Sequence, residues 1–406
     1  MTRRSGHGTP YPNGIFEGIE VFLKFLRLHN PELIDFSVYL LKKGIIEPDT
    51  YILDLDGMED NARRLGDIAI SRDLRLYFMS KQIGRNPEAS RRVLAAGGKA
   101  FCGMAAVDYR EAETLHASGL PVKHIGHLLQ VPHRGWDAAL DMKPDVITLF
   151  SLEKARKLSE MAERRGFVQK ILIKVWDKDD VFYPGQQGGF ELCELEKAAA
   201  YMGKLRGVVI AGLTSFPCFL FDGSEKKALP TPNVRTLARG RKILKSLGIR
   251  GGYINMPSCN SLATLPAASN LGATHAEPGH SLTGTNPDNL FEKNPLKPSM
   301  LYITEVSHTF EGESFCFGGG YYRRAKLRCA LIKSVENYEE VPVSAPDLES
   351  VDYHFRISGF FPAGTPVVMA FRTQIFVTRS RVALVEGSAS SRPVLAGIWD
   401  SLGRQL

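Results

Sequence analysis

The sequence predicts an α/β fold in which a (β/α)8 TIM-like barrel is followed by a C-terminal all-β domain. Eight short, continuously apolar runs alternate with charged segments of helical periodicity, which is the pattern of a parallel sheet covered by helices. After Asn286 the helical segments stop, and runs rich in β-branched and aromatic residues replace them. A chain of 406 residues has room for a barrel of roughly 250 residues and a smaller second domain.

The segment before the barrel contains two predicted helices and a strand. Apolar residues recur at helical spacing from Ile15 to Leu41, and "NPEL" divides this stretch into two amphipathic helices. "TYILDLDGMEDNARRL" then indicates a short strand that leads into a helix. We expect residues 1–57 to pack against the C-terminal domain.

The barrel is predicted to span residues 58–295 and the β-domain residues 296–406. The boundary falls in "NPDNLFEKNPLKP", whose three prolines and polar residues are typical of a domain linker. The predicted barrel strands are "LRLYFMSK", "KAFCGMAAV", "VKHIGHLLQV", "DVITLFS", "KILIKVWD", "GVVIAGLTSFP", "GYINMPSCNS" and "ATHAEPGH". The predicted β-domain runs are "MLYITEVSHTF", "SFCFGGGYY", "AKLRCALIKSV", "TPVVMAFRTQIFVTRS" and "RVALVEG".

Charge and composition argue against several function classes. The net charge of +7 is spread without a long basic block, so we do not expect nucleic-acid binding. The six cysteines include no C-x-x-C pair and no metal-ligand spacing, which favours a reducing compartment and no metal. The sequence contains no signal-peptide pattern and no uninterrupted apolar span, so we expect a soluble, cytoplasmic protein without a membrane partner.

A lone lysine, Lys81, closes the first barrel strand in "LYFMSKQIGRNP". Active sites of such barrels lie at the carboxyl ends of the strands. A partly desolvated lysine at this end has a neutral amine that can form a Schiff base with a carbonyl compound. The alternative is an ordinary surface lysine where the strand meets its loop.

The ends of the seventh and eighth strands carry residues suited to a phosphate. Glycine lets backbone N–H groups approach a phosphate, and the loops after the last two strands of such barrels are frequent phosphate sites. Closure of the barrel makes these strands neighbours of the first. The residues concerned are Ser258, Asn260 and Ser261 in "SCNSLAT", and Glu277, Gly279 and His280 in "THAEPGHSLTG". Taken singly, each stretch is also compatible with an ordinary turn.

These motifs together resemble those of the fold type III pyridoxal-phosphate (PLP) enzymes, the alanine racemase and basic-amino-acid decarboxylase superfamily. The resemblance is carried by "MSKQIGRNP", "GLTSFP", "CNSLAT" and "EPGH". Further stretches, "FYPGQQGGF", "FGGGYYRR" and "FRTQIFVTRS", are similar to the YhfX-type branch of predicted amino-acid racemases, from about Asn30 to the C-terminus. The resemblance implies the cofactor pyridoxal 5′-phosphate, an amino-acid substrate and a homodimer whose subunits share the active site.

The resemblance also implies that Lys81 carries PLP as a Schiff base and, once freed, moves the α-proton of the substrate. Arg85 stands where alanine racemases have a tyrosine near the phosphate, and a guanidinium binds phosphate well. Ser261 matches the phosphate-binding serine of the family. Gly279 and His280 match its phosphate-binding glycine and the backbone N–H that follows.

Glu277 departs from the alanine racemase pattern, since those enzymes have arginine at this point while the decarboxylases have glutamate. A carboxylate beside the ring nitrogen of PLP favours the protonated ring and makes the cofactor a stronger electron sink. A stronger electron sink favours both racemisation and decarboxylation, so Glu277 does not distinguish between these two reactions. The alternative is that Glu277 caps the start of a helix or pairs with an arginine on the surface.

Two-base racemisation needs a second acid/base on the opposite face of the substrate. The family takes a tyrosine from the partner subunit, and the source here is Tyr321 or Tyr322 in "FGGGYYRR". Cys316 lies nearby, and decarboxylases of the superfamily use a cysteine in this domain, which keeps the decarboxylase alternative open. The glycines and tyrosines also fit a tight turn packed on a sheet.

His124 and His127 in "HIGHLLQV" fit poorly into a purely apolar strand. His127 either faces the cofactor ring or is a hydrogen-bonded core histidine. Lys174 and Asp177 occupy the place of a strand-end motif of the family, or they form a buried ion pair. Ser215 stands where the family often has a histidine near the pyridine ring, which puts the role of that histidine in doubt here.

One barrel segment and two arginines of the β-domain remain. Residues 183–186, "YPGQ", are expected to form a loop at the mouth. Arg372 and Arg379 either bind a substrate carboxylate across the dimer or, as we favour, form salt bridges on a β surface.

The sequence therefore predicts a PLP-dependent amino-acid racemase. A PLP-dependent amino-acid decarboxylase is the first alternative. A non-catalytic PLP carrier or homeostasis protein is the alternative of a different class. The β-domain argues against a carrier, because small cofactor-handling relatives are single barrels without it.

Overall fold

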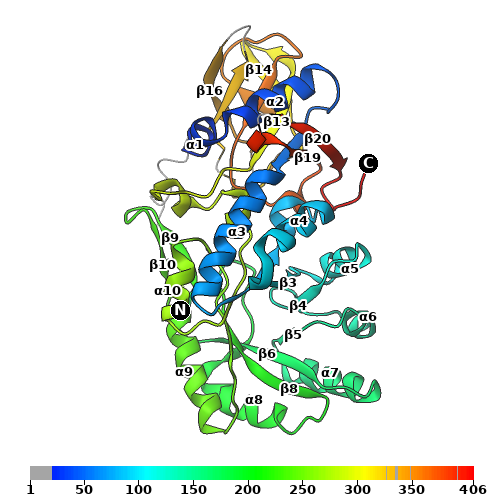
Figure 1. The fold of residues 1–406 in the computed structure, drawn as a ribbon, viewed down its shortest axis with the longest axis vertical. Coiled ribbons are helices and arrows are strands. Elements are labelled where there is room, and N and C mark those ends of the chain that lie inside the picture. The colour runs from blue at the N-terminus through cyan, green and yellow to red at the C-terminus, as the bar shows by residue number, and fades with distance from the viewer. Residues whose placement is uncertain (1–20, 326, 334–336, 348, 391) are drawn as a thin grey trace, which may run out of the picture.

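The computed structural model describes residues 21–325, 327–333, 337–347, 349–390 and 392–406. A parallel barrel lies at one end of the molecule and a largely antiparallel β-domain at the other (Figure 1). Helices α3 (Leu55–Ser71) and α4 (Pro87–Gly97) pack against each other in the region between them. This is the predicted fold class.

Eight parallel strands close the barrel, and each coincides with one of the eight predicted runs. The ring runs β2-β3-β4-β5-β6-β8-β11-β12, and β12 pairs again with β2. The strands are β2 (Arg75–Met79), β3 (Phe101–Ala105), β4 (Val122–Ile125), β5 (Val146–Leu149), β6 (Gln169–Trp176), β8 (Val208–Thr214), β11 (Tyr253–Asn255) and β12 (His275–Ala276). A short strand, β7 (Phe190–Glu191), extends the sheet beside β6, and β9 (Phe219–Asp222) pairs with β10 (Lys227–Pro230) in a hairpin.

Helices cover the outer face of the barrel (Figure 1). Besides α3 and α4 they are α5 (Tyr109–Ala117), α6 (Trp136–Asp141), α7 (Leu152–Arg164), α8 (Leu195–Met202), α9 (Asn233–Ser246) and α10 (Thr264–Asn270). Four of the helices begin at a side chain that accepts a hydrogen bond from a backbone N–H of the first turn, namely Asp54, Asn86, Asp108 and Ser151. Because the eight barrel strands all pair in parallel, their carboxyl ends face the same end of the barrel.

The β-domain is built on strands that follow the barrel. They are β13 (Met300–Phe310), β14 (Glu313–Phe317), β15 (Cys329–Lys333), β16 (Tyr338–Ser344), β17 (His354–Ile357), β18 (Pro366–Met369), β19 (Arg381–Glu386) and β20 (Val394–Trp399). β13 pairs with both β14 and β18, so that β13, β14, β17, β16, β15 and β18 form a closed ring. β1 (Thr50–Asp54) joins this sheet from the N-terminal side, antiparallel to β13 and parallel to β19.

Two helices precede β1, and both pack on the β-domain. They are α1 (Val21–His29) and α2 (Pro31–Lys42), separated at Asn30, and Pro31 is suited to the first position of a helix. Apolar residues of both helices share a buried cluster with Leu301, Leu331 and Val368. Residues 15–20 of the predicted first helix lie outside the described residues. None of the described helices is both long and apolar enough to cross a membrane.

One predicted strand is shorter than expected. The run "TPVVMAFRTQIFVTRS" forms a strand only over β18, and the chain then continues as a loop with a 3-10 turn at Ile375–Val377. Phe371 and Ile375 of this loop are buried, while Arg372 and Gln374 line a cavity of the barrel. The alternation of apolar and polar residues is thus that of a loop with a buried side and not of a strand.

Candidate active site

A cavity lies at the carboxyl ends of the barrel strands, as the fold predicts. Its wall includes Lys81 after β2, His127 after β4 and Glu277 after β12. The β-domain of the same chain contributes Arg324, Arg372 and Gln374. The cavity is therefore bounded by both domains.

Lys81 lies in a short turn that is fixed by a left-handed glycine and by hydrogen bonds to Glu111. β2 ends at Met79, and residues Ser80–Ile83 form a 3-10 turn closed by Gly84 in the left-handed region. The Ser80 hydroxyl donates to Glu111 Oε1 at 2.9 Å, and Val107 N donates to Glu111 Oε2 at 2.6 Å. The turn is thus tied to the start of α5 through a fully buried carboxylate.

Burial lowers the pKa of Lys81 from its usual 10.5 to about 8. The negative charges of Glu111 and Glu277 oppose this effect, whereas the guanidinium groups of Arg372 and Arg324 add to it. A substantial fraction of the amine is therefore neutral near pH 8, as nucleophilic attack on a carbonyl requires.

We expect trace acetylation of Lys81 in the cofactor-free protein to rise with pH and level off above a midpoint of about 8. The sign follows from the lowered pKa, because only the deprotonated amine reacts. Mass spectrometry of the Lys81 peptide, with exposed Lys204 as the internal reference, gives the profile. A midpoint near 10.5 would contradict the desolvated lysine.

Glu111 is expected to set this midpoint. Its negative charge raises the pKa of Lys81, so Glu111→Gln should move the acetylation midpoint below that of the unmodified protein. The same change weakens two hydrogen bonds and should cost about 1–2 kcal/mol in the free energy of unfolding. Glu113→Gln, on the exposed side of α5, is the matched control. An unmoved midpoint would show that Glu111 acts only structurally.

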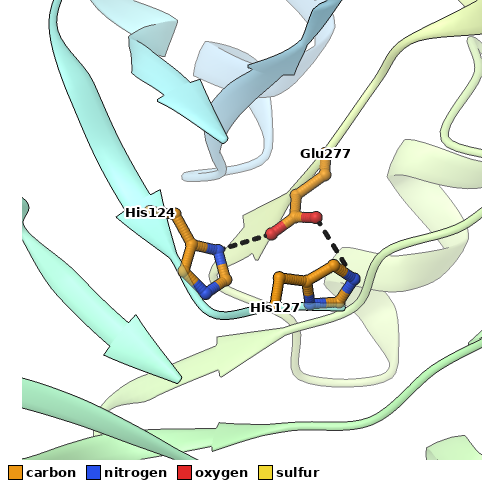
Figure 2. A group of neighbouring side chains, drawn as sticks. All are labelled: His124, His127 and Glu277. Atoms are coloured by element: carbon orange, nitrogen blue, oxygen red, sulfur yellow. Dashed lines mark hydrogen bonds and ion pairs between the residues drawn. The ribbon is translucent and has the colours of Figure 1, made fainter. Parts of the chain in front are cut away.

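Glu277 lies between two histidines (Figure 2). Oε1 accepts hydrogen bonds from His124 Nδ1 at 2.6 Å and from Asn255 Nδ2 at 2.8 Å. The other ring nitrogen of His124 lies 2.7 Å from Thr148 Oγ1, which fixes the orientation of the imidazole. Burial alone raises the pKa of Glu277, but the neighbouring imidazoles and the two hydrogen bonds lower it to about 2. The carboxylate is therefore ionised throughout the neutral range.

The second oxygen of Glu277 is an open acceptor. Oε2 is buried, has no hydrogen-bond partner among the described residues and lies 3.5 Å from His127 Nε2. Burial lowers the pKa of His127 to about 3, so that its ring is neutral. A buried, ionised acceptor without a donor fits the protonated ring nitrogen of PLP. Neither nitrogen of His127 has a hydrogen-bond partner among the described residues.

The same three side chains are also a possible set of metal ligands, with ligand atoms within 4.8 Å of one another. The distance of 2.6 Å between His124 Nδ1 and Glu277 Oε1 is that of a hydrogen bond. Two ligands of one tetrahedral zinc ion would stand about 3.3 Å apart, as the metal–ligand bond lengths require. The observed arrangement is a hydrogen-bonded carboxylate.

The loops after β11 and β12 form the part of the cavity that suits a phosphate. A Cβ at Gly279 would lie 2.5 Å from Gln82 Nε2, so a larger residue here would have to displace the Gln82 amide, which also lines the cavity. Ser258 and Cys259 both have positive φ, at 90° and 48°, which is unusual for residues with side chains and turns this loop toward the cavity. His280 also lines the cavity, and its Nε2 has no partner among the described residues.

Arg372 lies at the same end of the cavity. Burial lowers the pKa of His280, and the charge of Arg372 is the next largest cause. Arg372 Nε is buried without a hydrogen-bond partner in the described chain. The guanidinium that sequence analysis assigned to a β-surface salt bridge is therefore a candidate phosphate ligand. Arg379, by contrast, pairs with Asp352 at 2.8 Å, as a surface salt bridge would.

Arg85 does not line the cavity, although the sequence suggested it as a phosphate ligand. Its guanidinium pairs with Asp108 at 3.1 Å and lies over the ring of Phe376. Arg85 also has a positive φ of 56°. This arrangement helps to fix the turn that bears Lys81, and we do not include Arg85 among the proposed ligands.

Three polar residues named from the sequence are engaged in holding the loops. The hydroxyl of Ser261 donates to Asp288, and Ser261 does not line the cavity. Ser215 accepts a hydrogen bond from Asn233 at 3.1 Å and is likewise outside the lining. Asn260 lines the cavity, but its amide bonds the backbone of Glu277 at 2.8 Å and of Met256 at 3.0 Å.

Ser258 lines the cavity, and its hydroxyl donates to Phe219 O at 2.8 Å. Lys174 is fully buried, donates to Gln186 O at 3.3 Å and does not pair with Asp177. Because Asp177 pairs instead with Arg239, the suggested buried ion pair is wrong. Tyr183 and Gln186 line the cavity from the expected mouth loop.

Tyr321 and Tyr322 lie on the loop after β14 and do not line the cavity of their own chain. Both are partly exposed. Cys316 is fully buried inside the β-domain, where its Sγ lies 3.7 Å from Phe355 O. A thiol enclosed in this way cannot reach a substrate without rearrangement of the domain, so we do not include Cys316 among the proposed catalytic residues.

Three residues that complete the site were not singled out from the sequence, namely Asn255, Glu111 and Arg324. The sequence shows Asn255 and Glu111 without their roles, because these depend on contacts with residues far apart in the chain. The same holds for the contact of His124 with Glu277. Arg324 belongs to "FGGGYYRR", and its position in a motif already singled out was a signal that could have found it.

Two family models match the chain. The model described as "Alanine racemase, N-terminal domain" matches residues 53–287, and the model described as "YhfX-like, C-terminal domain" matches residues 301–395. The uncharacterized protein YhfX of Escherichia coli (strain K12) is 44% identical over 388 residues, which are 95% of this chain and 100% of that protein. Its name assigns no reaction.

Solved structures share the fold at low identity. Alanine racemase from Corynebacterium glutamicum is 18% identical with a TM-score of 0.59, over 80% of this chain and 90% of that one. D-threo-3-hydroxyaspartate dehydratase from Delftia sp. HT23 is 15% identical with a TM-score of 0.63, over 86% of this chain and 97% of that one. Since these two proteins are named for different reactions, the likeness identifies the fold and not the reaction.

Proposed function

Because the chain belongs to the alanine racemase N-terminal-domain family and its C-terminal domain to the YhfX-like group, we propose that it is a PLP-dependent amino-acid racemase. The family uses pyridoxal 5′-phosphate and acts at the α-carbon of amino acids. The observation that carries the proposal is the presence of Lys81 and the open acceptor Oε2 of Glu277 in one cavity.

In this proposal each residue of the site has its own role toward the cofactor and the substrate. When bound, PLP withdraws electrons from the substrate and stabilises the charge left at the α-carbon when its proton departs. Lys81 holds the cofactor and moves that proton on one face, for which its pKa of about 8 is well suited. Glu277 keeps the ring nitrogen protonated. Gly279, His280 and Arg372 bind the phosphate.

The second acid/base is a tyrosine of a partner subunit in this proposal. Tyr321 and Tyr322 do not line the cavity of their own chain in the described residues, yet they are partly exposed beside the residues that do. A homodimer would bring this loop of one subunit to the cavity of the other. Two-base chemistry then has Lys81 on one face and a tyrosine on the other.

Mixed dimers test this assignment. We expect Lys81→Ala and the double variant Tyr321→Phe/Tyr322→Phe to be inactive alone, and their equimolar reassembled mixture to regain about a quarter of the activity. Half of the reassembled dimers are hybrids, and each hybrid has one site with both groups intact if the tyrosine comes from the partner. A mixture that stays inactive although hybrid dimers form would place the tyrosine in the same chain or outside the mechanism.

Decarboxylation remains the alternative, because Glu277 supports any reaction that passes through negative charge at the α-carbon. Decarboxylases of the superfamily use a cysteine of the β-domain, but Cys316 is fully buried and therefore does not support a decarboxylase here. Incubation with single enantiomers, followed by chiral chromatography and amine analysis, separates the two. Appearance of the mirror-image amino acid supports the racemase, and appearance of the amine with loss of carbon dioxide would replace it by a decarboxylase.

A further inference from the structure

We infer that Thr148 and His124 are positioning residues for Glu277: the Thr148 hydroxyl donates to His124, which keeps the imidazole neutral and leaves the negative charge of Glu277 uncompensated. This positioning role rests on the proposed function, because the group that would use the charge is the ring nitrogen of PLP. Neither Thr148 nor His124 lines the cavity, so both act on a bound cofactor only through Glu277.

The three side chains form one line of hydrogen bonds in the interior of the barrel. Thr148 lies on β5, His124 on β4 and Glu277 directly after β12. Thr148 Oγ1 lies 2.7 Å from His124 Nε2. His124 Nδ1 lies 2.6 Å from Glu277 Oε1, and Figure 2 shows this contact. Since all three side chains are buried, water does not replace a missing donor or acceptor in this line.

The proton on Nδ1 of His124 follows from the state of Glu277. The pKa of this carboxyl is lowered to about 2, so at neutral pH it carries no proton and only accepts hydrogen bonds. Its Oε1 already accepts one from Asn255 at 2.8 Å. His124 Nδ1 is therefore the donor in the contact with Oε1, which requires a proton on that nitrogen.

The Thr148 hydroxyl decides the state of the second nitrogen of His124. A hydroxyl has one hydrogen to donate, and Nε2 is the only hydrogen-bond partner of Thr148 Oγ1 among the described residues. A proton on Nε2 would leave this buried hydroxyl hydrogen without an acceptor and would place a positive charge in the core. His124 is therefore neutral, with its proton on Nδ1 and its Nε2 lone pair bound by Thr148.

A neutral His124 leaves Glu277 with its full negative charge. Asn255 and His124 then donate hydrogen bonds to Oε1 without adding positive charge. His127 is neutral as well, because burial lowers its pKa to about 3. An imidazolium at the place of His124 would form an ion pair with Glu277 and cancel much of the charge that a bound ring nitrogen meets at Oε2. The two donors also hold the carboxylate by Oε1, so that Oε2 is the oxygen left open in the described chain.

Magnetic resonance of ¹⁵N-labelled histidine measures this protonation state directly. A ring nitrogen that carries a proton resonates far from a bare one, and His124→Asn identifies the two His124 signals by their loss. We expect a protonated Nδ1 and a bare Nε2 near neutral pH, in the cofactor-free and in the PLP-loaded protein. Thr148→Val should move the signal of the bare nitrogen, whereas Thr148→Ser, which keeps the hydroxyl, should not. Two protonated nitrogens, a proton on Nε2 alone, or a bare nitrogen that Thr148→Val does not move would overturn the inference.

Two variants of His124 show whether a bound cofactor depends on the donor. Asparagine offers an amide N–H near the place of Nδ1, whereas leucine fills the space without a donor. With the PLP-loaded protein we expect His124→Leu to lower kcat at least tenfold and His124→Asn to recover most of this loss. Both variants should keep the cofactor on Lys81, as borohydride fixation measures. Equal kcat values for the two variants would contradict the positioning role.

Failure of the positioning role is distinguishable from failure of the racemase proposal. The protonation state of His124 is measured without turnover and without the cofactor. A neutral His124 that is bonded to Thr148, in a protein that exchanges no α-proton, would support the inferred hydrogen bonds and contradict the racemase proposal. Exchange of the α-proton by a protein with an imidazolium at His124 would support the proposed function and overturn the inference.

Discussion

Replacing Lys81 with alanine is expected to lower turnover at least 1,000-fold and to abolish covalent retention of the cofactor. Lys81 is the lysine at the end of β2, it lines the cavity, and its pKa is lowered to about 8. Loss of a group that both anchors the cofactor and transfers a proton removes contributions that neither water nor a neighbouring side chain replaces. Turnover, visible absorbance after gel filtration and borohydride-fixed cofactor measured by mass spectrometry are the readouts.

Lys174 offers a matched control for this prediction. It is also buried, and burial lowers its pKa to about 8, but it donates to Gln186 O and does not line the cavity. We therefore expect Lys174→Met to retain covalently bound cofactor on the Lys81 peptide. Cofactor fixed to the Lys174 peptide, or full turnover by Lys81→Ala, would refute the assignment of Lys81.

Replacing Glu277 with glutamine is expected to lower kcat about 100-fold while leaving the cofactor attached. The carboxylate, with a pKa of about 2, is ionised, and its Oε2 is the open acceptor for the ring nitrogen. A neutral amide does not hold a proton on that nitrogen by charge, so less negative charge is stabilised at the α-carbon. Steady-state kinetics and the absorbance spectrum of the bound cofactor measure the two effects.

Glu277→Asp is the conservative counterpart, because it restores the negative charge at a shorter reach and should recover part of kcat. Since the pKa of Glu277 is about 2, we also expect no loss of activity from its protonation between pH 5 and 7. An unchanged kcat in Glu277→Gln would mean that the carboxylate does not contact the cofactor ring.

Local patterns in the sequence were sufficient to predict the architecture. All eight barrel strands coincide with continuous apolar runs, because strands buried on both faces select such runs irrespective of their distant partners. The run from 365 to 380 was misjudged because its aromatic and β-branched residues are those of a strand, whereas after Met369 it is a loop that buries Phe371 and Ile375 and lines the cavity with Arg372 and Gln374. Composition alone does not contain that information.

The site could be predicted only in part. Lys81, Glu277 and Gly279 were found because topology alone places strand ends at the mouth of a barrel. Arg85 and Ser261 were assigned to the phosphate by position, but Asp108 and Asp288 bind their side chains from distant points in the chain. The orientation of a polar side chain is decided by its nearest partner in space, and a single sequence does not show that partner.

The most direct test of the central claim is proton NMR of the PLP-loaded protein in D₂O with L- and D-amino acids, followed at the α-proton. The proposal predicts loss of the α-proton signal with the carbon skeleton intact, for at least one amino acid, and no such loss with Lys81→Ala. An α-proton signal that persists for every amino acid tested would contradict proton transfer at the α-carbon by Lys81.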